Sequence, residues 1–304
     1  MNIVDLTNPG CRDISDAWFQ LLFKILEEGS VFVIDRGSYA GQKRLEFDYV
    51  TVKINYPGTE PLLPQIPGQY GIPNPVADDY IYGGEGYDRS YIEYLMTGRK
   101  EPGESYTYGE RLTSVDMINY WLDLLFFKST EHMNEIYYGS DISSLEAIER
   151  DNTFNEKIMC SSSDRPDIYD CLTEDKDVPV FFLNQIEYII HTYKTKGFRN
   201  NQLVLQVAQP SDIILKDPPC LRQIDTRVQN NKLHFFVYFR SWDLWGGFPA
   251  NLAIIETLKQ YMAAEIGVEN GQIIAASKGL HLYDYTFDMA KCLRMREDMV
   301  LKEG

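Results

Sequence analysis

The segment Asn251–Ile266 (NLAIIETLKQYMAAEI) constrains the fold more than any other part of the sequence. Its pattern predicts a helix, but apolar side chains occupy most of the helix circumference. Such a helix has to be buried on nearly all sides, so other elements must pack around it. Strand-like runs at 31–54, 202–207, 232–239 and 271–283 can form that layer. We therefore expect an α+β fold, with mixed or mostly antiparallel strands around one long buried helix.

The length and composition fit a single large domain spanning residues 1–304. With 44% hydrophobic and 13% aromatic residues, the chain can bury a substantial core. Helical periodicity predicts further helices at 13–26, 115–127 and 182–195. The stretch at about 113–180 is largely polar and poorly periodic, and it has too little apolar mass for a core of its own. We interpret it as an insertion into the domain.

Composition also limits the partners of the chain. A formal net charge of −16 argues against binding to a nucleic-acid polymer, but it leaves room for a small anion held by a few arginines. The five cysteines include no CxxC pair and the four histidines no metal-like cluster, so we expect neither disulfides nor a metal site. The sequence has no secretory start and no apolar run of about eighteen residues, so a cytoplasmic location away from membranes is expected.

Cys220 has an unusual local sequence for a free cysteine. It follows Pro218 and Pro219, which stiffen the chain, and it precedes a predicted hairpin whose far strand ends at Arg240. A guanidinium close to the sulfur would favour the thiolate, which is the nucleophilic form. Free cysteines are also among the most buried residue types. The residues alone leave two readings open, a nucleophile facing an anion site and a structural thiol.

Several arginines stand at the ends of predicted strands. Arg240 and Ser241 could clamp an oxyanion or a phosphate, because a planar fork of donors lies beside a hydroxyl. Arg36 precedes a glycine-containing turn, and Arg199 lies just before a strand. Each could contact phosphate from such a position. Taken singly, each of these arginines is more often an ordinary residue of a surface ion pair or a solvated turn.

Three further residues could read a ligand. Asn251 is expected to cap the buried helix, or to use its two-sided amide to read a pyrimidine edge. His281 and Tyr283 lie two apart on a predicted strand, so they share a face. They could hold sugar hydroxyls, although a buried histidine satisfied within the core is the more common outcome.

Three segments together resemble the thymidylate synthase superfamily, closest in pattern to its short dUMP and CMP hydroxymethylase-like members. They read PPC at 218–220, RSWDLWGGFPAN at 240–251 and GLHLY at 279–283, and the intervals between them fit the family without a gap. DRGSYAG at 35–41 resembles the family's early phosphate-binding loop, and YTYGERL at 106–112 its tyrosine–glycine segment. The resemblance implies a three-layer fold with a large mixed sheet packed across a dimer interface.

The resemblance also implies a site shared between the subunits of a homodimer. It assigns catalysis to Cys220, Arg240, Asp243 and Tyr108. It assigns the binding of a pyrimidine nucleotide monophosphate to Arg36, Arg199, Arg240, Ser241, Asn251, His281 and Tyr283, with Arg199 supplied by the partner subunit. It assigns the binding of the donor 5,10-methylenetetrahydrofolate to Asp243, Gly247 and Trp242. The family also uses a buried glutamate, for which Glu46, Glu60 and Glu93 are all possible.

The sequence departs from the familiar synthases in ways that bear on the product. Phe239 replaces the usual glutamine, Trp242 and Trp245 add aromatic bulk, and Asn200–Asn201 replace paired arginines. The last residues, 295–304, are charged where the synthases have a closing apolar segment. A site that seals less well admits water, which gives a hydroxymethyl group instead of a methyl group. We therefore expect a deoxyuridylate or uridylate 5-hydroxymethyltransferase of a bacterial, archaeal or phage-infected cell, with thymidylate synthase and then CMP or dCMP hydroxymethylase as alternatives.

Overall fold

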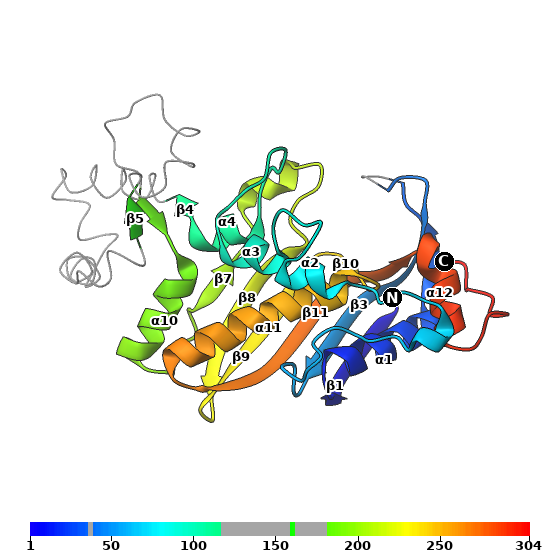
Figure 1. Cartoon of the computed structure of the whole chain (residues 1–304), viewed down its shortest axis with the longest axis horizontal. Helices are drawn as coiled ribbons and strands as arrows, with labels where there is room; N and C mark the ends of the chain where they lie inside the picture. Colours follow the sequence, from blue (N-terminus) through cyan, green and yellow to red (C-terminus); the bar gives the residue numbers. More distant parts are fainter. Residues whose placement is uncertain (36–38, 117–158, 162–180) are drawn as a thin grey trace.

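The computed structural model describes residues 1–35, 39–116, 159–161 and 181–304 (Figure 1). Within them, one mixed sheet is built from β1 (Ile3–Cys11), β2 (Ser30–Val33), β3 (Lys43–Ile54), β7 (Val204–Gln206), β8 (Leu221–Gln229), β9 (Lys232–Phe239), β10 (Trp242–Asp243) and β11 (Glu269–Tyr283). The strand order is β1-β3-β11-β9-β8-β7, with β2 on β3 and β10 on β11. β11 runs parallel to β9 and β10 but antiparallel to β3. The expected mixed sheet is confirmed.

Helices cover one face of this sheet, as Figure 1 shows. They are α1 (Ile14–Glu28), α10 (Gln185–Lys196) and α11 (Gly247–Ile266), while α12 (Phe287–Leu293) follows β11. Three short helices pack near the N-terminal end of α11 and the neighbouring loops, namely α2 (Asp78–Tyr82), α3 (Tyr91–Met96) and α4 (Tyr108–Thr113). No helix of the described residues is long and apolar enough to cross a membrane.

The long helix α11 is buried as the sequence predicted. Leu252, Leu258 and Met262 are all 0% exposed. Its two charged core residues neutralise each other, since Lys259 Nζ lies 2.8 Å from Glu256 Oε2 and both residues are fully buried. Lys259 Nζ also donates to the Gly271 carbonyl at 2.6 Å. The pair therefore ties the middle of α11 to β11 without leaving an unpaired charge in the core.

Two predicted helix boundaries are wrong. Val115–Asp116 is a short strand, β4, which pairs with Phe182–Leu183 of β6 (Phe181–Leu183), and β5 (Met159–Ser161) pairs with the other side of β6. The helix expected at 182–195 therefore begins only at Gln185, after Asn184 has capped it by accepting two backbone N–H groups. Of the insertion expected at about 113–180, only 113–116 and 159–161 are among the described residues.

The buried ion pair on α11 gives a test of the fold. Replacing Lys259 with methionine keeps the length of the side chain but leaves the Glu256 carboxylate unpaired in the core. We expect Lys259→Met to lower the free energy of unfolding by about 3–5 kcal/mol, measured by urea denaturation. The double variant Glu256→Leu/Lys259→Met should recover most of that loss, because it buries no charge. A single variant as stable as the wild type would show that the pair is not buried as described.

Candidate functional site

The β8–β9 hairpin brings Cys220 and Arg240 together. The strands pair in antiparallel register from Gln229–Lys232 at the turn to Leu221–Phe239 at the open end. The turn residues Asn230 and Asn231 adopt left-handed backbone conformations, with φ of 52° and 58°, which suits a tight two-residue hairpin. At the open end, the Arg240 backbone N–H donates to the Cys220 carbonyl at 2.9 Å. The predicted proximity of the two residues is therefore observed.

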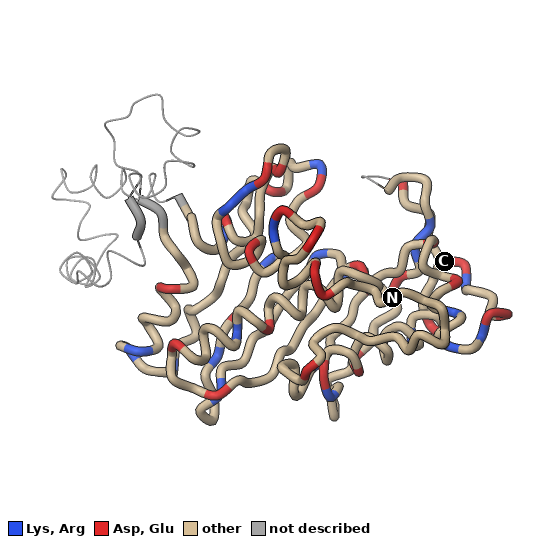
Figure 2. The backbone as a smooth tube through the Cα atoms, in the orientation of Figure 1, with Lys and Arg blue, Asp and Glu red and all other residues tan. Residues whose placement is uncertain are grey.

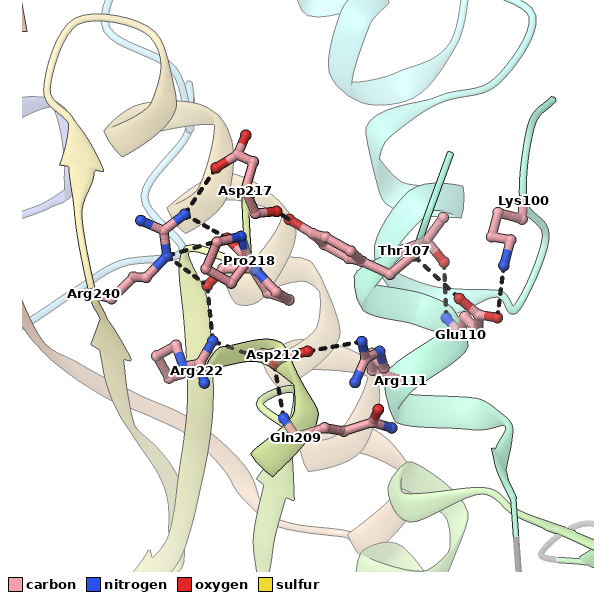
Figure 3. A network of polar contacts seen from close by, with 12 residues as sticks. Lys100, Thr107, Glu110, Arg111, Gln209, Asp212, Asp217, Pro218, Arg222 and Arg240 are labelled. Carbon is pink, nitrogen blue, oxygen red and sulfur yellow. Dashed lines mark hydrogen bonds and ion pairs between the residues drawn. The ribbon is translucent and has the colours of Figure 1, made fainter. Parts of the chain in front are cut away.

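The Arg240 guanidinium is fixed by the segment that leads to Cys220 (Figure 3). Its Nη2 donates to Asp217 Oδ1 at 3.0 Å, and its Nε donates to the Pro218 carbonyl at 3.1 Å. The third nitrogen, Nη1, has no partner among the described residues. Ser241, the next residue, is half-buried. An oriented arginine whose Nη1 has no partner among the described residues is suited to bind an anion.

The Cys220 sulfur lies in a mixed electrostatic environment. Burial raises the pKa of the thiol, the charge of Arg240 opposes that effect, and the nearby Asp217 carboxylate adds to it. The net pKa is raised, so in the free protein the guanidinium offsets only part of the cost of burial. Cys11 differs, because burial together with two aspartates raises its pKa to about 12. Of these two thiols, only Cys220 has an arginine acting on it.

Two arginines near Cys220 were not singled out from the sequence. Arg111 Nη2 donates to Asp212 Oδ1 at 3.0 Å, and Arg222 Nη1 donates to Asp212 Oδ2 at 3.3 Å (Figure 3). Asp212 is only 1% exposed, so both ion pairs are anchored in the protein interior. Arg222 lies on β8, two residues after Cys220. This short spacing was the one sequence signal that could have pointed to Arg222. Figure 2 shows acidic and basic residues interspersed along the described chain. Charge clustering therefore does not single out Arg111 and Arg222, and only their contacts with Asp212 do.

Asp243 joins the sheet to the start of α11. It lies on β10 and pairs with His281 of β11, while its neighbour Trp242 pairs with Leu280. The Asp243 carboxylate accepts N–H groups from Gly246 at 3.0 Å and Gly247 at 2.8 Å. A carboxylate that accepts the first free N–H groups of a helix caps it and complements its dipole. The helix α11 begins at Gly247 with Gly246 as its N-cap residue, so the expected role of Asn251 as the N-cap is wrong.

A pocket of about 290 Å³ opens beside this helix start. It is lined by Pro75, Val76, Ala77, Tyr80, Tyr87, Tyr91, Asp243, Gly246, Gly247 and Ala250. The rings of Tyr80 and Tyr91 stack at 5.0 Å. A β-carbon on Gly247 would approach the Asp243 side chain to 3.2 Å, so glycine keeps this wall close to the carboxylate. Aromatic walls with one carboxylate suit a flat heteroaromatic ring that carries N–H donors.

Trp242 does not line this pocket, contrary to its expected contact with a folate. It is 1% exposed and is packed between Phe239, whose ring centroid is 4.1 Å away, and Phe248 at 4.5 Å. Its indole Nε1 donates to Asn251 Oδ1 at 3.0 Å. The other end of the Asn251 amide, Nδ2, donates to the Tyr91 hydroxyl at 2.6 Å. Trp242 therefore supports Asn251 from the core.

A hydrogen bond within β11 fixes the tautomer of the His281 imidazole. Its Nδ1 lies 2.8 Å from the Gly279 carbonyl, which can only accept, so Nδ1 carries the proton. Burial lowers the pKa of His281, which keeps the ring neutral and leaves Nε2 as an acceptor. Nε2 is buried without a partner among the described residues. The ring packs edge-on against Tyr283, with centroids 4.7 Å apart.

Tyr108 supports the strand that carries the cysteine. Its hydroxyl accepts the Leu221 backbone N–H at 3.3 Å, one residue beyond Cys220. Burial raises the pKa of Tyr108 well above its usual value, so the hydroxyl stays protonated at neutral pH. The side chain is 7% exposed and packs edge-on against Tyr94 of α3. Tyr108 therefore links α3 and α4 to the start of β8.

Of the two further arginines expected at the phosphate, one lies outside the described residues and the other is not brought to Cys220 within one chain. Arg36 lies outside the described residues. Arg199 is exposed in the loop after α10, and this loop leads to Leu203, which pairs with Thr226. Thr226 is six residues along β8 from Cys220, a separation of about 20 Å.

The expected glutamate has no clear position at the Asn251 amide. Glu60 and Glu93 are exposed, and the carboxylate of Glu93 accepts the Ser90 N–H in the capping box of α3. Glu46 is paired with Arg44 on β3. The residue from α3 that contacts the Asn251 amide is Tyr91.

Comparisons with known proteins agree with this architecture. The family model described as thymidylate synthase matches residues 115–301, which is more than half of the chain. A protein named "Putative thymidylate synthase" from Methanosarcina acetivorans is 25% identical over 280 residues, covering 92% of this chain and 91% of that protein. One of the same name from Methanosarcina mazei is 33% identical over 109 residues, covering 36% of this chain and 50% of that protein.

A phage enzyme is similar over a shorter region. The deoxyuridylate hydroxymethyltransferase of Bacillus phage SP01 is 42% identical over 69 residues, covering 22% of this chain and 18% of that protein. The family model covers more than half of the chain. The α+β fold and the hairpin that places a cysteine beside an arginine agree with this match. This chain belongs to the thymidylate synthase family of one-carbon transferases.

Proposed function

We propose that this chain is a deoxyuridylate or uridylate 5-hydroxymethyltransferase with Cys220 as its nucleophile. The observation that carries the proposal is the arrangement at the open end of the β8–β9 hairpin. There a half-buried thiol lies beside an oriented guanidinium whose Nη1 has no partner in the part of the chain that the structure describes. The Asp243 carboxylate is also close enough to contribute to the raised pKa of the Cys220 thiol. A nucleotide phosphate on Arg240 would leave its base between Cys220 and the Asp243 pocket.

Nucleotide binding is assigned group by group. Arg240 Nη1 and the Ser241 hydroxyl bind the 5′-phosphate, and Arg36 adds a further positive charge. Asn251 reads the base through the amide donor and acceptor that its protein contacts leave free. His281 Nε2, an acceptor without a protein partner among the described residues, accepts a sugar hydroxyl, and Tyr283 packs beside it.

The chemistry of the chain's own residues starts at sulfur. The Cys220 thiolate forms a bond to C6 of uracil, and the electrons of the C5–C6 double bond move to C5, which becomes the carbon nucleophile. Arg240 stabilises the thiolate against the cost of burial. Tyr108 holds the start of β8 through the Leu221 N–H and so positions the sulfur. Once C5 carries the one-carbon unit and has given its proton to water, the C6–sulfur bond breaks, the ring double bond returns and Cys220 leaves as the thiolate.

The pocket beside Asp243 suits the flat pterin ring of a folate. Stacked tyrosines provide flat walls, and the Asp243 carboxylate uses one oxygen for two helix N–H groups and the other for the Trp245 N–H. That second oxygen keeps room for another donor. When bound, 5,10-methylenetetrahydrofolate supplies the one-carbon unit, and also the hydride if the product is to be a methyl group. In the hydroxymethyl reaction, water completes the new group and tetrahydrofolate is released.

Two observations support the hydroxymethyl product. The phage relative with this activity is 42% identical over its matched region. The pocket formed by the described residues is also open to solvent, which gives water access to the base. A second candidate is thymidylate synthase, because the Methanosarcina acetivorans relative that carries this name covers 92% of the chain. Both products require the same nucleophile and the same base.

A homodimer would complete the phosphate site. The sheet face away from α11 carries partly exposed side chains, including Phe236 at 40% exposure on β9, and could pack against a second copy. Arg199, which lies far from Cys220 within one chain, could then reach the partner's phosphate site. A chain that stays monomeric by light scattering while turning over its substrate would contradict this arrangement.

The nucleophile is tested by Cys220→Ser. We expect turnover of dUMP with methylenetetrahydrofolate to fall by at least about a thousandfold, because a serine hydroxyl is a far weaker nucleophile than a thiolate. The dissociation constant for dUMP should change by only a few fold, since phosphate and base contacts remain. Cys292→Ser, a half-buried thiol on α12, is the matched control and should keep wild-type rates. Wild-type turnover in Cys220→Ser would exclude covalent catalysis.

The product separates the two candidate activities. With dUMP and methylenetetrahydrofolate, a hydroxymethyltransferase releases tetrahydrofolate and a nucleotide heavier by one hydroxymethyl substituent. A thymidylate synthase releases dihydrofolate, which is followed by its near-ultraviolet absorbance, and a methylated nucleotide. We expect the hydroxymethyl product by mass spectrometry without a rise in dihydrofolate. Stoichiometric dihydrofolate with thymidylate would replace the leading proposal by the second.

The role of His281 predicts a dependence on the sugar. A 3′-deoxy analogue of dUMP cannot donate to Nε2, so wild-type protein should bind it roughly tenfold more weakly than dUMP. His281→Phe should bind both nucleotides equally. Because burial lowers the pKa of His281 below 6.5, the neutral acceptor persists as the pH falls through 6.5, and the discrimination should weaken only on further acidification. Equal wild-type affinities, measured by calorimetry, would remove His281 from the sugar site.

A further inference from the structure

We infer that Trp242 is a specificity-determining positioning residue, which locks the Asn251 amide in the orientation that accepts uracil and rejects cytosine. This inference rests on the proposed use of a pyrimidine nucleotide. It starts from two hydrogen bonds of a buried amide. Asn251 is 7% exposed, its Oδ1 accepts the Trp242 indole N–H at 3.0 Å, and its Nδ2 donates to the Tyr91 hydroxyl at 2.6 Å.

The two partners do not constrain the amide equally. A tyrosine hydroxyl both donates and accepts, so Tyr91 could face either end of the amide. An indole N–H only donates, so Trp242 requires the carbonyl end. Turning the amide over would place two donors against each other at a site where Trp242 is 1% exposed and water has little access. Of these two partners, Trp242 is therefore the one that determines which end of the Asn251 amide faces the core.

The indole cannot easily turn away to relieve such a clash. Its ring lies nearly parallel to Phe239, with centroids 4.1 Å apart and planes 12° apart. Phe248, in the first turn of α11, packs on it with centroids 4.5 Å apart. Trp242 also pairs with Leu280 through β10, which fixes its backbone. The donor therefore points at Asn251 from a rigid position.

The locked amide offers one pattern to a ligand. A carbonyl oxygen has two lone pairs and an amide nitrogen two hydrogens, so after its protein contacts Asn251 retains one acceptor and one donor side by side. Uracil presents the complementary N–H and C=O at N3 and C4, whereas cytosine presents an acceptor nitrogen and an amino group in the same places. Binding cytosine would require the amide to turn over, which Trp242 opposes.

Trp242→Phe tests the inference by removing the donor while keeping an aromatic ring in the stack. The measurement is equilibrium binding of dUMP and of dCMP by calorimetry. We expect the dissociation constant for dCMP divided by that for dUMP to fall roughly tenfold or more relative to wild type. The change should come mainly from tighter dCMP binding, because the turned amide no longer meets a buried donor. Trp245→Phe is the matched control, a neighbouring buried tryptophan that packs on Trp18, and should keep the wild-type ratio.

A double variant separates orientation from packing. In an Asn251→Asp background there is no amide to turn, so adding Trp242→Phe should leave the nucleotide ratio unchanged. If Trp242→Phe does not fold, Trp242→His is used, because imidazole can accept as well as donate and should also lower the ratio. Equal weakening of both nucleotides, with the ratio preserved, would make Trp242 a packing residue and overturn the inference. Wild-type protein that binds neither nucleotide would instead overturn the proposed function.

Discussion

The capping of α11 by Asp243 is the interaction on which the candidate site depends. One carboxylate oxygen accepts N–H groups from Gly246 and Gly247, while the backbone of Asp243 pairs with His281 in the sheet. A buried helix needs its first N–H groups satisfied, so the cap is a requirement of folding as well as of function. It also fixes the rotation of α11, and with it the direction in which Asn251 faces. The same carboxylate lines the pocket that we propose for the folate, so one side chain serves both the stability of the fold and the proposed ligand site.

Local signals in the sequence were enough for much of the fold. The β8–β9 hairpin follows from alternating strands around two asparagines, and the burial of α11 follows from its apolar circumference. The errors arose where a distant partner decides the structure. Phe181–Leu183 resembles the start of a helix, yet it becomes a strand because β4 and β5 pair with its two edges. The helix α11 begins at Gly247, four residues before the predicted start at Asn251. Asp243, which lies outside the predicted helix segment, accepts the Gly247 N–H.

The candidate site shows the same division. Cys220 lies just before β8, Arg240 just after β9 and Asp243 on β10, so motif spacing could place them together. Tyr91 could not be found in this way, because it reaches Asn251 across 160 positions of the chain and only the packing of α3 on α11 joins them. Arg111 and Arg222 were also missed, since what distinguishes them is a shared contact with the buried Asp212. Contacts of this kind depend on tertiary packing and leave no periodic pattern in the sequence.

Two departures from the familiar synthases are physically one feature. Read along the sequence, Phe239 and Trp242 are separate substitutions, an aromatic ring for a glutamine and a large side chain in the following segment. In the structure their rings stack 4.1 Å apart, and the stack ends at the Asn251 amide. A glutamine at 239 would provide no ring face for the indole, and a tryptophan without that face would be freer to change rotamer. The aromatic pair therefore acts as a unit that supports one polar group from the core. A residue with no access to the ligand can in this way determine which ligand the amide beside it accepts.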